Sequence, residues 1–309
     1  MKRWWIRPLV RLFAALLLPL LVPAVITWFI WLLPGDPASL ICPPHLCGGT
    51  EALAERWNLD GGPWQFFTGW VSQALRLEFG NSWQVVQGLP IYDLLIEAIP
   101  TTGILIALST VMIMTGAVAT ARGWIPEQVD SALRIIGLIP ALLLALAGAA
   151  VIDLTYGFGS LSGSTARLFV GALVLGFADG AFTGAVLGTR STFKTENQAR
   201  YVGIAVLRGE RRIHNTLPNV APALIGQMRA RIVHLLSGAV VVEVVMRIDG
   251  IGGFLWGATI TQDFGFLLAT ATVFALLSSA LLLIQAALET LVALHVMRAP
   301  SDVHVLEAK

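Results

Sequence analysis

The feature that most limits this chain is a set of long apolar stretches, each about the length needed to cross a lipid bilayer. About 20 apolar residues in a helix span a hydrocarbon core that is about 30 Å thick. Such stretches occupy residues 12–33, 101–120, 133–152, 168–187, 223–245 and 266–296. Charged residues make up only 13% of the chain, whereas a soluble domain carries about 25%. We therefore predict an all-α integral membrane protein with six transmembrane helices.

The basic residues predict how these helices are oriented. A basic segment at residues 2–11 precedes the first stretch, which is longer than the apolar core of a signal peptide. Six crossings place both ends of the chain on one side, and basic residues favour the cytoplasmic side. The loops predicted on that side hold Arg122, Arg190, Lys194, Arg200, Arg208, Arg211, Arg212 and Arg298. We expect a multi-pass protein with both termini in the cytoplasm.

Proline and glycine at residues 34–37 end the first apolar stretch. We divide the chain into an N-terminal transmembrane helix (1–33), an extracytoplasmic segment (34–98) and a five-helix core (99–309). The middle segment is acidic and contains no lysine, as is typical of a translocated region. Its two cysteines, Cys42 and Cys47, would form a short disulfide in an oxidising compartment. The alternatives are two unrelated loop residues, or a zinc site to which only His45 adds a nearby ligand.

Several classes of function lack their sequence signals. Neither G-x-x-x-x-G-K-[ST] nor G-x-G-x-x-G occurs, so any nucleotide energy must come from a separate polypeptide. A net charge of +1 gives no global basic surface for nucleic acid. Ser237 and His234 lie three residues apart on one predicted helix, which is a poor arrangement for an intramembrane protease. We expect no enzyme activity, and no metal or cofactor on this chain.

Three acidic residues lie within the apolar stretches, where a charge must face the bundle interior or water. The sharper hypothesis for Asp179 is that it lines a cavity and favours a cationic group, such as an amino terminus. The alternative is a hydrogen-bonded packing residue. For Glu243, a role in lining such a cavity competes with a role in positioning helices. Glu289 is expected near the cytoplasmic interface, and His234 and His295 are interpreted as structural residues.

Residues 190–222 form the longest predicted cytoplasmic loop, and it is basic. A short amphipathic helix in this loop would dock in a groove on a cytoplasmic partner. The alternative is an ordinary positively charged loop that only fixes the topology. A second informative segment follows the fifth stretch, where Gly250, Gly252 and Gly253 permit a tight re-entrant turn. Such a turn must be shielded by protein or line a cavity, unless it is a plain extracytoplasmic turn.

Short motifs along nearly the whole chain occur in an order typical of one transporter family. They are Leu32-Leu33-Pro34-Gly35-Asp36-Pro37, Asn58-Leu59-Asp60, Glu78-Phe79-Gly80-Asn81-Ser82, Pro90-Ile91, Ile99-Pro100-Thr101-Thr102, Ser237-Gly238-Ala239-Val240-Val241-Val242-Glu243, Gly250-Ile251-Gly252-Gly253 and Gln262-Asp263. Together these motifs resemble permease subunits of binding-protein-dependent ABC transporters of the dipeptide/oligopeptide/nickel class. The predicted cytoplasmic loop resembles the coupling loop of that class. The matching residues are Tyr201, Val202, Ala205, Gly209, Leu217 and Asn219.

The resemblance implies a type I ABC importer architecture in a bacterial inner membrane. The chain would form the translocation path for peptides or a similar small solute, with Asp179, Glu243, Gly250 and Gly252 along that path. Its implied partners are a second permease subunit, two ATPase subunits that bind ATP and Mg, an extracytoplasmic solute-binding protein, and membrane lipid. Two alternatives stay open. One is an ion-gradient-driven secondary transporter, which predicts inverted repeats, and the other is a non-transporting membrane scaffold derived from a permease.

Overall fold

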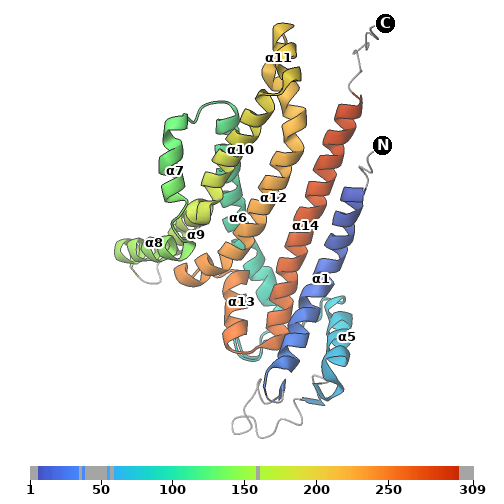
Figure 1. Ribbon diagram of the computed structural model, residues 1–309. Helices are drawn as coiled ribbons and strands as arrows, with labels where there is room; N and C mark the ends of the chain where they lie inside the picture. The colour runs from blue at the N-terminus through green and yellow to red at the C-terminus, as the bar shows by residue number, and fades with distance from the viewer. Residues whose placement is uncertain (1–5, 35–36, 39–53, 56–58, 158–160, 299–309) are drawn as a thin grey trace.

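The computed structural model describes residues 6–34, 37–38, 54–55, 59–157 and 161–298, which are predominantly helical. Long helices run side by side through the molecule (Figure 1). They are α1 (Ile6–Leu32), α6 (Ile91–Ala121), α12 (Arg212–Met246) and α14 (Phe264–Arg298). Within these ranges the extended pairing is limited to an isolated bridge between Asn81 and Pro90. The predicted all-α class is confirmed for the described part of the chain.

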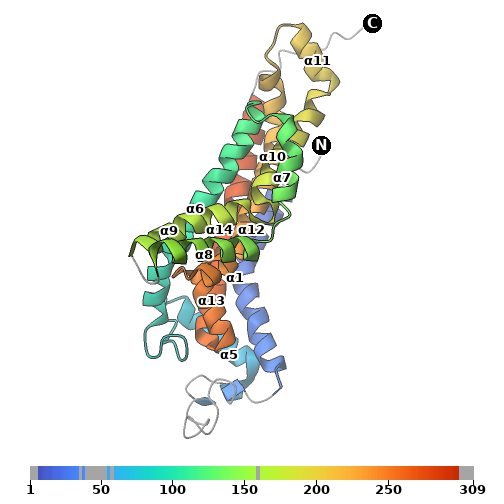
Figure 2. The same cartoon turned by 90° about the vertical axis from the view of Figure 1, so that its left-hand side faces the viewer.

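Shorter helices connect and cover the long ones. They are α5 (Gly62–Ala74), α7 (Asp130–Ile136), α8 (Ala141–Tyr156), α9 (Leu161–Phe177), α10 (Ala181–Asn197), α11 (Arg200–Leu207) and α13 (Ile251–Ile260). Single turns of 3₁₀-helix, η1 (Leu59–Gly61), η2 (Glu127–Val129) and η3 (Ala178–Gly180), precede α5, α7 and α10. Helices α8 and α9 lie across the long helices, and α11 lies at one extreme end (Figure 2). The molecule therefore has a crossed centre and a projecting tip.

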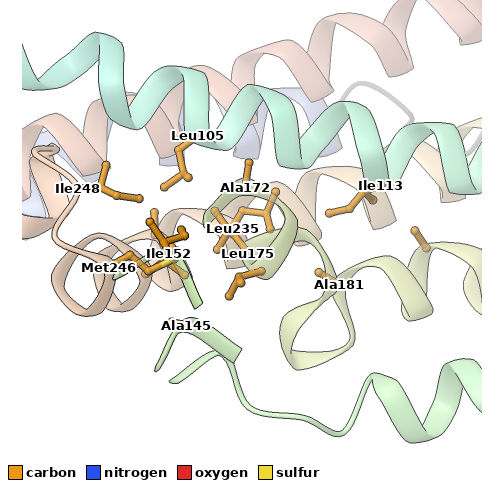
Figure 3. Packing of buried hydrophobic residues seen from close by; sticks show 14 residues of the cluster. Leu105, Ile113, Ala145, Ile152, Ala172, Leu175, Ala181, Leu235, Met246 and Ile248 are labelled. Carbon is orange, nitrogen blue, oxygen red and sulfur yellow. The ribbon is translucent and has the colours of Figure 1, made fainter. Parts of the chain in front are cut away.

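The main apolar core lies where α6, α8, α9, α10 and α12 meet (Figure 3). Leu105 of α6 and Leu235 of α12 are fully buried there. Small side chains, including Ala172 and Ala239, alternate with them and let the helix backbones approach closely. Two smaller clusters lie beside α5 and beside the α13–α14 turn. The core therefore ties the crossed centre to the long helices.

Helix α1 lies on the periphery of the bundle and packs along α14. Only 11% of its most apolar window is buried, and large side chains such as Phe13 and Phe29 are exposed. Arg11 near its start pairs with Glu289 near the end of α14, and Gln285 donates to the same carboxylate at 2.7 Å. The two ends of the described chain thus lie toward the same end of the bundle.

Four helical segments in the described residues are long and apolar enough to cross a membrane. They are Leu9–Leu32, Ile91–Ala121, Gly163–Asn197 and Phe264–Val292. A fifth arises if the bent pair Glu127–Ile136 and Ala141–Tyr156 is one span. Helix α12 is absent from this set because polar side chains such as Arg229 and Arg231 lower its hydropathy. The coarse prediction of several membrane-spanning helices is confirmed, and the predicted number of six stays a prediction.

The third predicted stretch, residues 133–152, is not one straight helix. The helices before and after residues 137–140 meet at 84°. Pro140 has extended backbone angles at the N-cap of α8, and a proline disfavours helical geometry in the residue before it. Gly137 sits close to η3, since a Cβ there would lie 3.2 Å from Gly180 Cα. The break thus comes from a proline next to a close backbone approach.

The predicted extracytoplasmic segment is described only in part. Helix α5 packs on α1 through Phe66 and Trp70, and the rings of Trp31 and Phe66 lie 5.3 Å apart. The predicted boundary at 98–99 falls inside α6, which begins at Ile91. Cys42, Cys47 and His45 lie outside the described residues.

Candidate functional site

Glu243 joins three elements at the turn between α12 and α13. Its side chain is buried, and its Oε1 accepts a hydrogen bond from Thr102 Oγ1 of α6 at 2.7 Å. Its Oε2 accepts from the backbone N–H groups of Gly252 at 2.7 Å and Gly253 at 3.1 Å. Thr102 Oγ1 in turn accepts from Ile251 N at 2.8 Å. The carboxylate therefore caps the N-terminus of α13, where a negative charge is favourable.

The glycines of this turn let the carboxylate approach the backbone. A Cβ at Gly250 would lie 2.4 Å from the Glu243 carboxyl carbon, and one at Gly252 would lie 2.7 Å from Val240 Cα. At Gly253 the nearest atom would be 3.5 Å away, which is an ordinary contact. Of the two roles considered for Glu243, this geometry favours helix positioning. Its assignment to the path, with Gly250 and Gly252, stays a prediction.

Asp263 makes a similar junction before α14. Its Oδ2 accepts from Ser82 Oγ at 2.7 Å and from the backbone N–H groups of Trp83 at 2.8 Å and Gln84 at 3.1 Å. Its Oδ1 accepts from Phe266 N at 3.3 Å, which caps α14. Asp263 and Ser82 are both buried. The motifs at 78–82 and 262–263, which resemble those of the transporter family, therefore contact each other in the folded chain.

Asp179 lies at the kink between α9 and α10. Its backbone is left-handed, with φ 50° and ψ 25°. Its Oδ1 accepts a hydrogen bond from Ala141 N at the start of α8, at 3.3 Å, while Asp179 N donates to Ile139 O at 3.2 Å. The residue therefore supports the α7–α8 bend. Unlike Glu243, its side chain is exposed.

The structure brings His234 of α12 to this kink, with its Nε2 3.9 Å from Asp179 Oδ2. The sequence interpretation of His234 as a lone structural histidine missed this neighbour. The two residues are 55 positions apart, and α10, α11 and part of α12 separate them in the chain. The only signal in the sequence was a polar side chain in each of two apolar stretches.

A groove reaches residues that are next in sequence to this site. It has a volume of about 1180 Å³ and is lined mainly by apolar side chains of α1, α12, α13 and α14, with Arg229 of α12 among them. Leu142 of α8 also lines it, next in sequence to Ala141, whose N–H donates to Asp179. On α12 its lining includes Val233, the residue before His234.

Helix α11, at the tip of the molecule, contains three of the six residues predicted to contact an ATPase, namely Tyr201, Val202 and Ala205. Val202 and Ala205 are buried against the rest of the chain, and α11 packs on α12 and α10. Ile204 and Leu207 are exposed, Leu207 by 88%. The helix thus has a buried inner face and an exposed, apolar outer face.

Gly209 has a structural task in this tip. Its φ is +84°. Its N–H donates to Val206 O at 3.0 Å, and the next residue, Glu210, donates to Ala205 O at 3.0 Å. This is the Schellman ending of a helix, which favours glycine. Gly209 therefore ends α11, and its predicted contact with a partner is not needed to explain it.

Tyr201 and Asn219 meet in the structure, whereas Leu217 lies apart from them. Tyr201 Oη donates to Glu196 and accepts from Asn219 Nδ2 at 2.7 Å. Burial and the bond to Glu196 raise the pKa of Tyr201 above its ordinary value. Leu217 and Asn219 are two positions apart on a helix, so their side chains point in directions about 200° apart. Leu217 lines a different groove, together with Phe193. The six predicted residues therefore do not form one surface.

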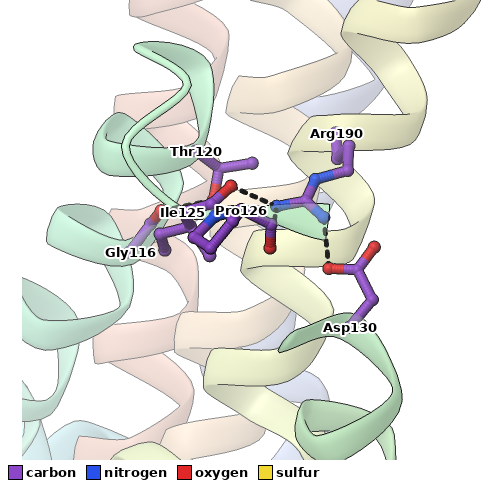
Figure 4. A network of polar contacts seen from close by, with 6 residues as sticks. All are labelled: Gly116, Thr120, Ile125, Pro126, Asp130 and Arg190. Atoms are coloured by element: carbon purple, nitrogen blue, oxygen red, sulfur yellow. Dashed lines mark hydrogen bonds and ion pairs between the residues drawn. The ribbon is translucent and has the colours of Figure 1, made fainter. Parts of the chain in front are cut away.

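The same end of the molecule is stiffened by Arg190 (Figure 4). Its guanidinium pairs with Asp130 and donates to Ile125 O at 2.7 Å. It thereby fixes the loop between α6 and α7 to α10.

Among the described residues, no group of His, Cys, Asp and Glu could hold a metal ion.

The chain resembles known transport proteins along most of its length. No family model matches it. The chain is 25% identical over 271 residues to the glutathione transport system permease protein GsiC of Salmonella typhi, covering 83% of this chain and 87% of that protein. It is 24% identical over 270 residues to the oligopeptide transport system permease protein AppB of Bacillus subtilis, covering 79% and 84%. These similarities confirm the resemblance to peptide-class permeases.

Proposed function

We propose that this chain is the transmembrane permease subunit of an ATP-driven importer of peptides or a similar small solute. The observation that carries the proposal is the tip formed by α11. Ile204 and Leu207 are exposed on the outer face of this helix, and its inner face is buried against the rest of the chain. An apolar helix face at the end of a bundle is suited to a groove in a partner. The names of the relatives, which are permease proteins of glutathione and oligopeptide transport systems, support this reading.

The proposed topology has six crossings and a type I importer architecture. Helix α12 supplies the fifth crossing, and its Arg231 side chain lies over Gly184 of α10 and near Ala181 O at 3.4 Å. An arginine shielded by protein is compatible with a membrane helix. Six crossings bring both ends to one side, in keeping with the Arg11–Glu289 pair. The basic residues around α11 favour a cytoplasmic position for that side, in a bacterial inner membrane.

The proposed partners follow from this arrangement. Two ATPase subunits, which would carry ATP and Mg, contact the α11 tip on the cytoplasmic side. A second permease subunit completes the path, and an extracytoplasmic solute-binding protein delivers the solute near α13. This chain does no covalent chemistry. It supplies the wall of the path and the lever through which nucleotide-driven movement reaches the helices.

The test is purification of the tagged full chain in mild detergent, with identification of its bound subunits by mass spectrometry and measurement of ATP hydrolysis. We expect a P-loop ATPase and a second permease. Leu207→Glu should lose the ATPase while keeping the second permease, because it places a charge on the exposed face of α11. The matched control is Leu75→Glu, which changes a leucine that is 80% exposed after α5, at the far end.

A folded chain that binds no nucleotide-binding subunit would contradict the proposal. That result would favour the gradient-driven transporter or the scaffold. Equal loss of the ATPase in both leucine variants would show that the tip has no special role.

A further inference from the structure

We propose that Asp179 and His234 form a binding site for the positively charged amino group of the transported solute, in which protonated His234 competes with that group for Asp179. This inference rests on the proposed transport function. It adds a residue, a ligand chemistry and a pH response to that function. The argument begins from where the two side chains lie.

Both side chains lie far from the ends of apolar segments. Asp179 is near the middle of the candidate span Gly163–Asn197, and His234 lies within the apolar part of α12. Their side chains are nevertheless 39% and 50% exposed. Because a charge facing lipid is costly, exposed ionisable side chains at this depth must face water or another polar group. A water-filled path through the membrane provides such surroundings.

Asp179 has acceptor capacity left for a ligand. An ionised carboxylate offers about four lone-pair sites. Within the described residues, Ala141 N is the one hydrogen-bond donor to the Asp179 side chain. The distance of 3.9 Å to His234 Nε2 is longer than a hydrogen bond. An ammonium group, which has three donors, could therefore bind at Oδ2.

The backbone at Asp179 has an uncommon conformation. A left-handed conformation is uncommon for residues other than glycine, although aspartate tolerates it better than most. The next residue, Gly180, is also left-handed, with φ 73°. The kink directs the carboxylate toward α8 and His234, and away from the apolar core beneath it. The position therefore combines a fixed backbone with an accessible charge.

The neighbouring groove favours a solute with an apolar body and a charged end. Its walls are almost wholly apolar and include Val233, next in sequence to His234, and Leu142, next in sequence to the residue that donates to Asp179. A short peptide has such a shape when its amino terminus sits at Asp179 and its side chains enter the groove. The groove alone would bind apolar compounds without distinguishing their charge.

Two charged pairs lie on the elements packed around the kink. Asp153 of α8 pairs with Arg167 of α9, and Asp130 of α7 pairs with Arg190 of α10. Other cations on the described parts of these helices include Arg134 of α7, Lys194 of α10, and Arg229 and Arg231 of α12. Arg229 lines the groove, and Arg231 lies at Ala181 O. Lysine and arginine side chains stay charged at working pH values, whereas the side chain that faces Asp179 Oδ2 is an imidazole.

The competition follows from charge balance. Imidazole side chains change charge between about pH 5 and pH 8. A protonated His234 forms an ion pair with Asp179, and a solute ammonium must then displace it. A neutral His234 leaves the carboxylate free to bind the ammonium. Binding of an amine-bearing solute should therefore weaken as the pH falls, while an N-acetylated solute should not respond in this way.

The experiment uses the assembled transporter in proteoliposomes, with ATP on the side of the membrane that the ATPase subunits face. The probes are radiolabelled trialanine and N-acetyl-trialanine, and uptake is divided by ATP hydrolysis in the same sample. Uptake of trialanine by the unaltered protein should fall several-fold between about pH 7.5 and pH 5.5, over which imidazoles protonate. His234→Gln should remove most of that fall.

Asp179→Asn should reduce trialanine uptake by about tenfold or more, which corresponds to loss of a charge-assisted hydrogen bond. Uptake of N-acetyl-trialanine should be little changed. The matched controls are His214→Gln on the α11 side and Asp93→Asn in the first turn of α6, which should keep the pH profile and the preference for the free amine.

Four outcomes would overturn the inference. Two of them are an unchanged pH profile in His234→Gln and an equal loss of uptake of both probes in Asp179→Asn; each leaves ATP-driven uptake, and so the proposed function, standing. Absence of ATP-driven uptake of either probe by the unaltered complex would instead refute peptide import and this inference with it. Inaccessibility of His234 to a water-soluble histidine reagent in the complex would show that the second subunit covers the pair.

Discussion

The turn between α12 and α13 and the kink between α9 and α10 each contain an acidic residue within an apolar region, but the two residues are held differently. Glu243 is 1% exposed and accepts three hydrogen bonds, two from backbone N–H groups. Asp179 is exposed and accepts one. A buried, fully bonded carboxylate stabilises the fold, since its donors have no other partner. An exposed carboxylate with spare acceptors can bind something else.

The largest effect should come from Glu243→Ala. The change leaves buried donors on Thr102, Gly252 and Gly253 without an acceptor, and each such loss is costly. We expect the free energy of unfolding to fall by about 3–5 kcal/mol, measured by thermal unfolding in detergent. Glu243→Gln keeps an acceptor oxygen and should lose less. Unaltered stability with abolished transport would instead place Glu243 in the path.

Asp263→Ala repeats this test at a second buried carboxylate. The loss of its bonds to Ser82, Trp83 and Phe266 should lower the free energy of unfolding by about 2–3 kcal/mol. Ser82→Ala removes one of those bonds and should cost about 1 kcal/mol. The measurement is the shift in unfolding temperature of the purified chain. If both variants were as stable as the original, burial and bonding would be poor guides to the role of a carboxylate here.

Gly252→Ala should cost about 1–3 kcal/mol, because a methyl group there meets backbone that cannot move aside easily. Its Cβ would lie 2.7 Å from Val240 Cα. The neighbouring Gly253→Ala is the matched control, with its nearest atom at 3.5 Å. Unfolding curves of the two variants should separate clearly. Coincident curves would mean that the close approach of α13 to α12 is not needed.

The smallest effect on stability should come from Asp179→Asn. Asparagine tolerates the left-handed conformation and can still accept from Ala141 N. The free energy of unfolding should therefore stay within about 0.5 kcal/mol of the original, while uptake of an amine-bearing peptide falls. A large loss of stability without a change in solute preference would make Asp179 a second structural carboxylate.

Sequence patterns predicted the peripheral α1 and the apolar helices α6 and α14 well, because long apolar runs dominate their behaviour. They predicted the bend after α7 poorly. Pro140 stands within an apolar stretch, and hydropathy does not register the loss of a backbone donor. The proximity of Gly137 to Gly180, which accompanies the break, is a contact between separate helices and leaves no mark on either segment alone.

The candidate site was predicted residue by residue but not as contacts. Asp179 and Glu243 were singled out because acids are costly in apolar helices, yet their different surroundings include Thr102 and His234, which lie far away in sequence. Gly209 was assigned to a partner contact, although it ends α11. Leu217 and Asn219 were grouped together, although helix geometry separates their side chains.

The packing of α1 on α14 has a consequence for how the chain is made. Arg11 and Glu289 are 278 positions apart, and a ribosome adds roughly 5–20 residues per second. The first helix therefore waits in the bilayer for roughly 15–60 s before its main neighbour is synthesised. During that time its leucine-rich surface is covered by lipid or by insertion machinery. The contact between α1 and α14, the first and last of the long helices to be synthesised, is therefore the last part of the bundle to form.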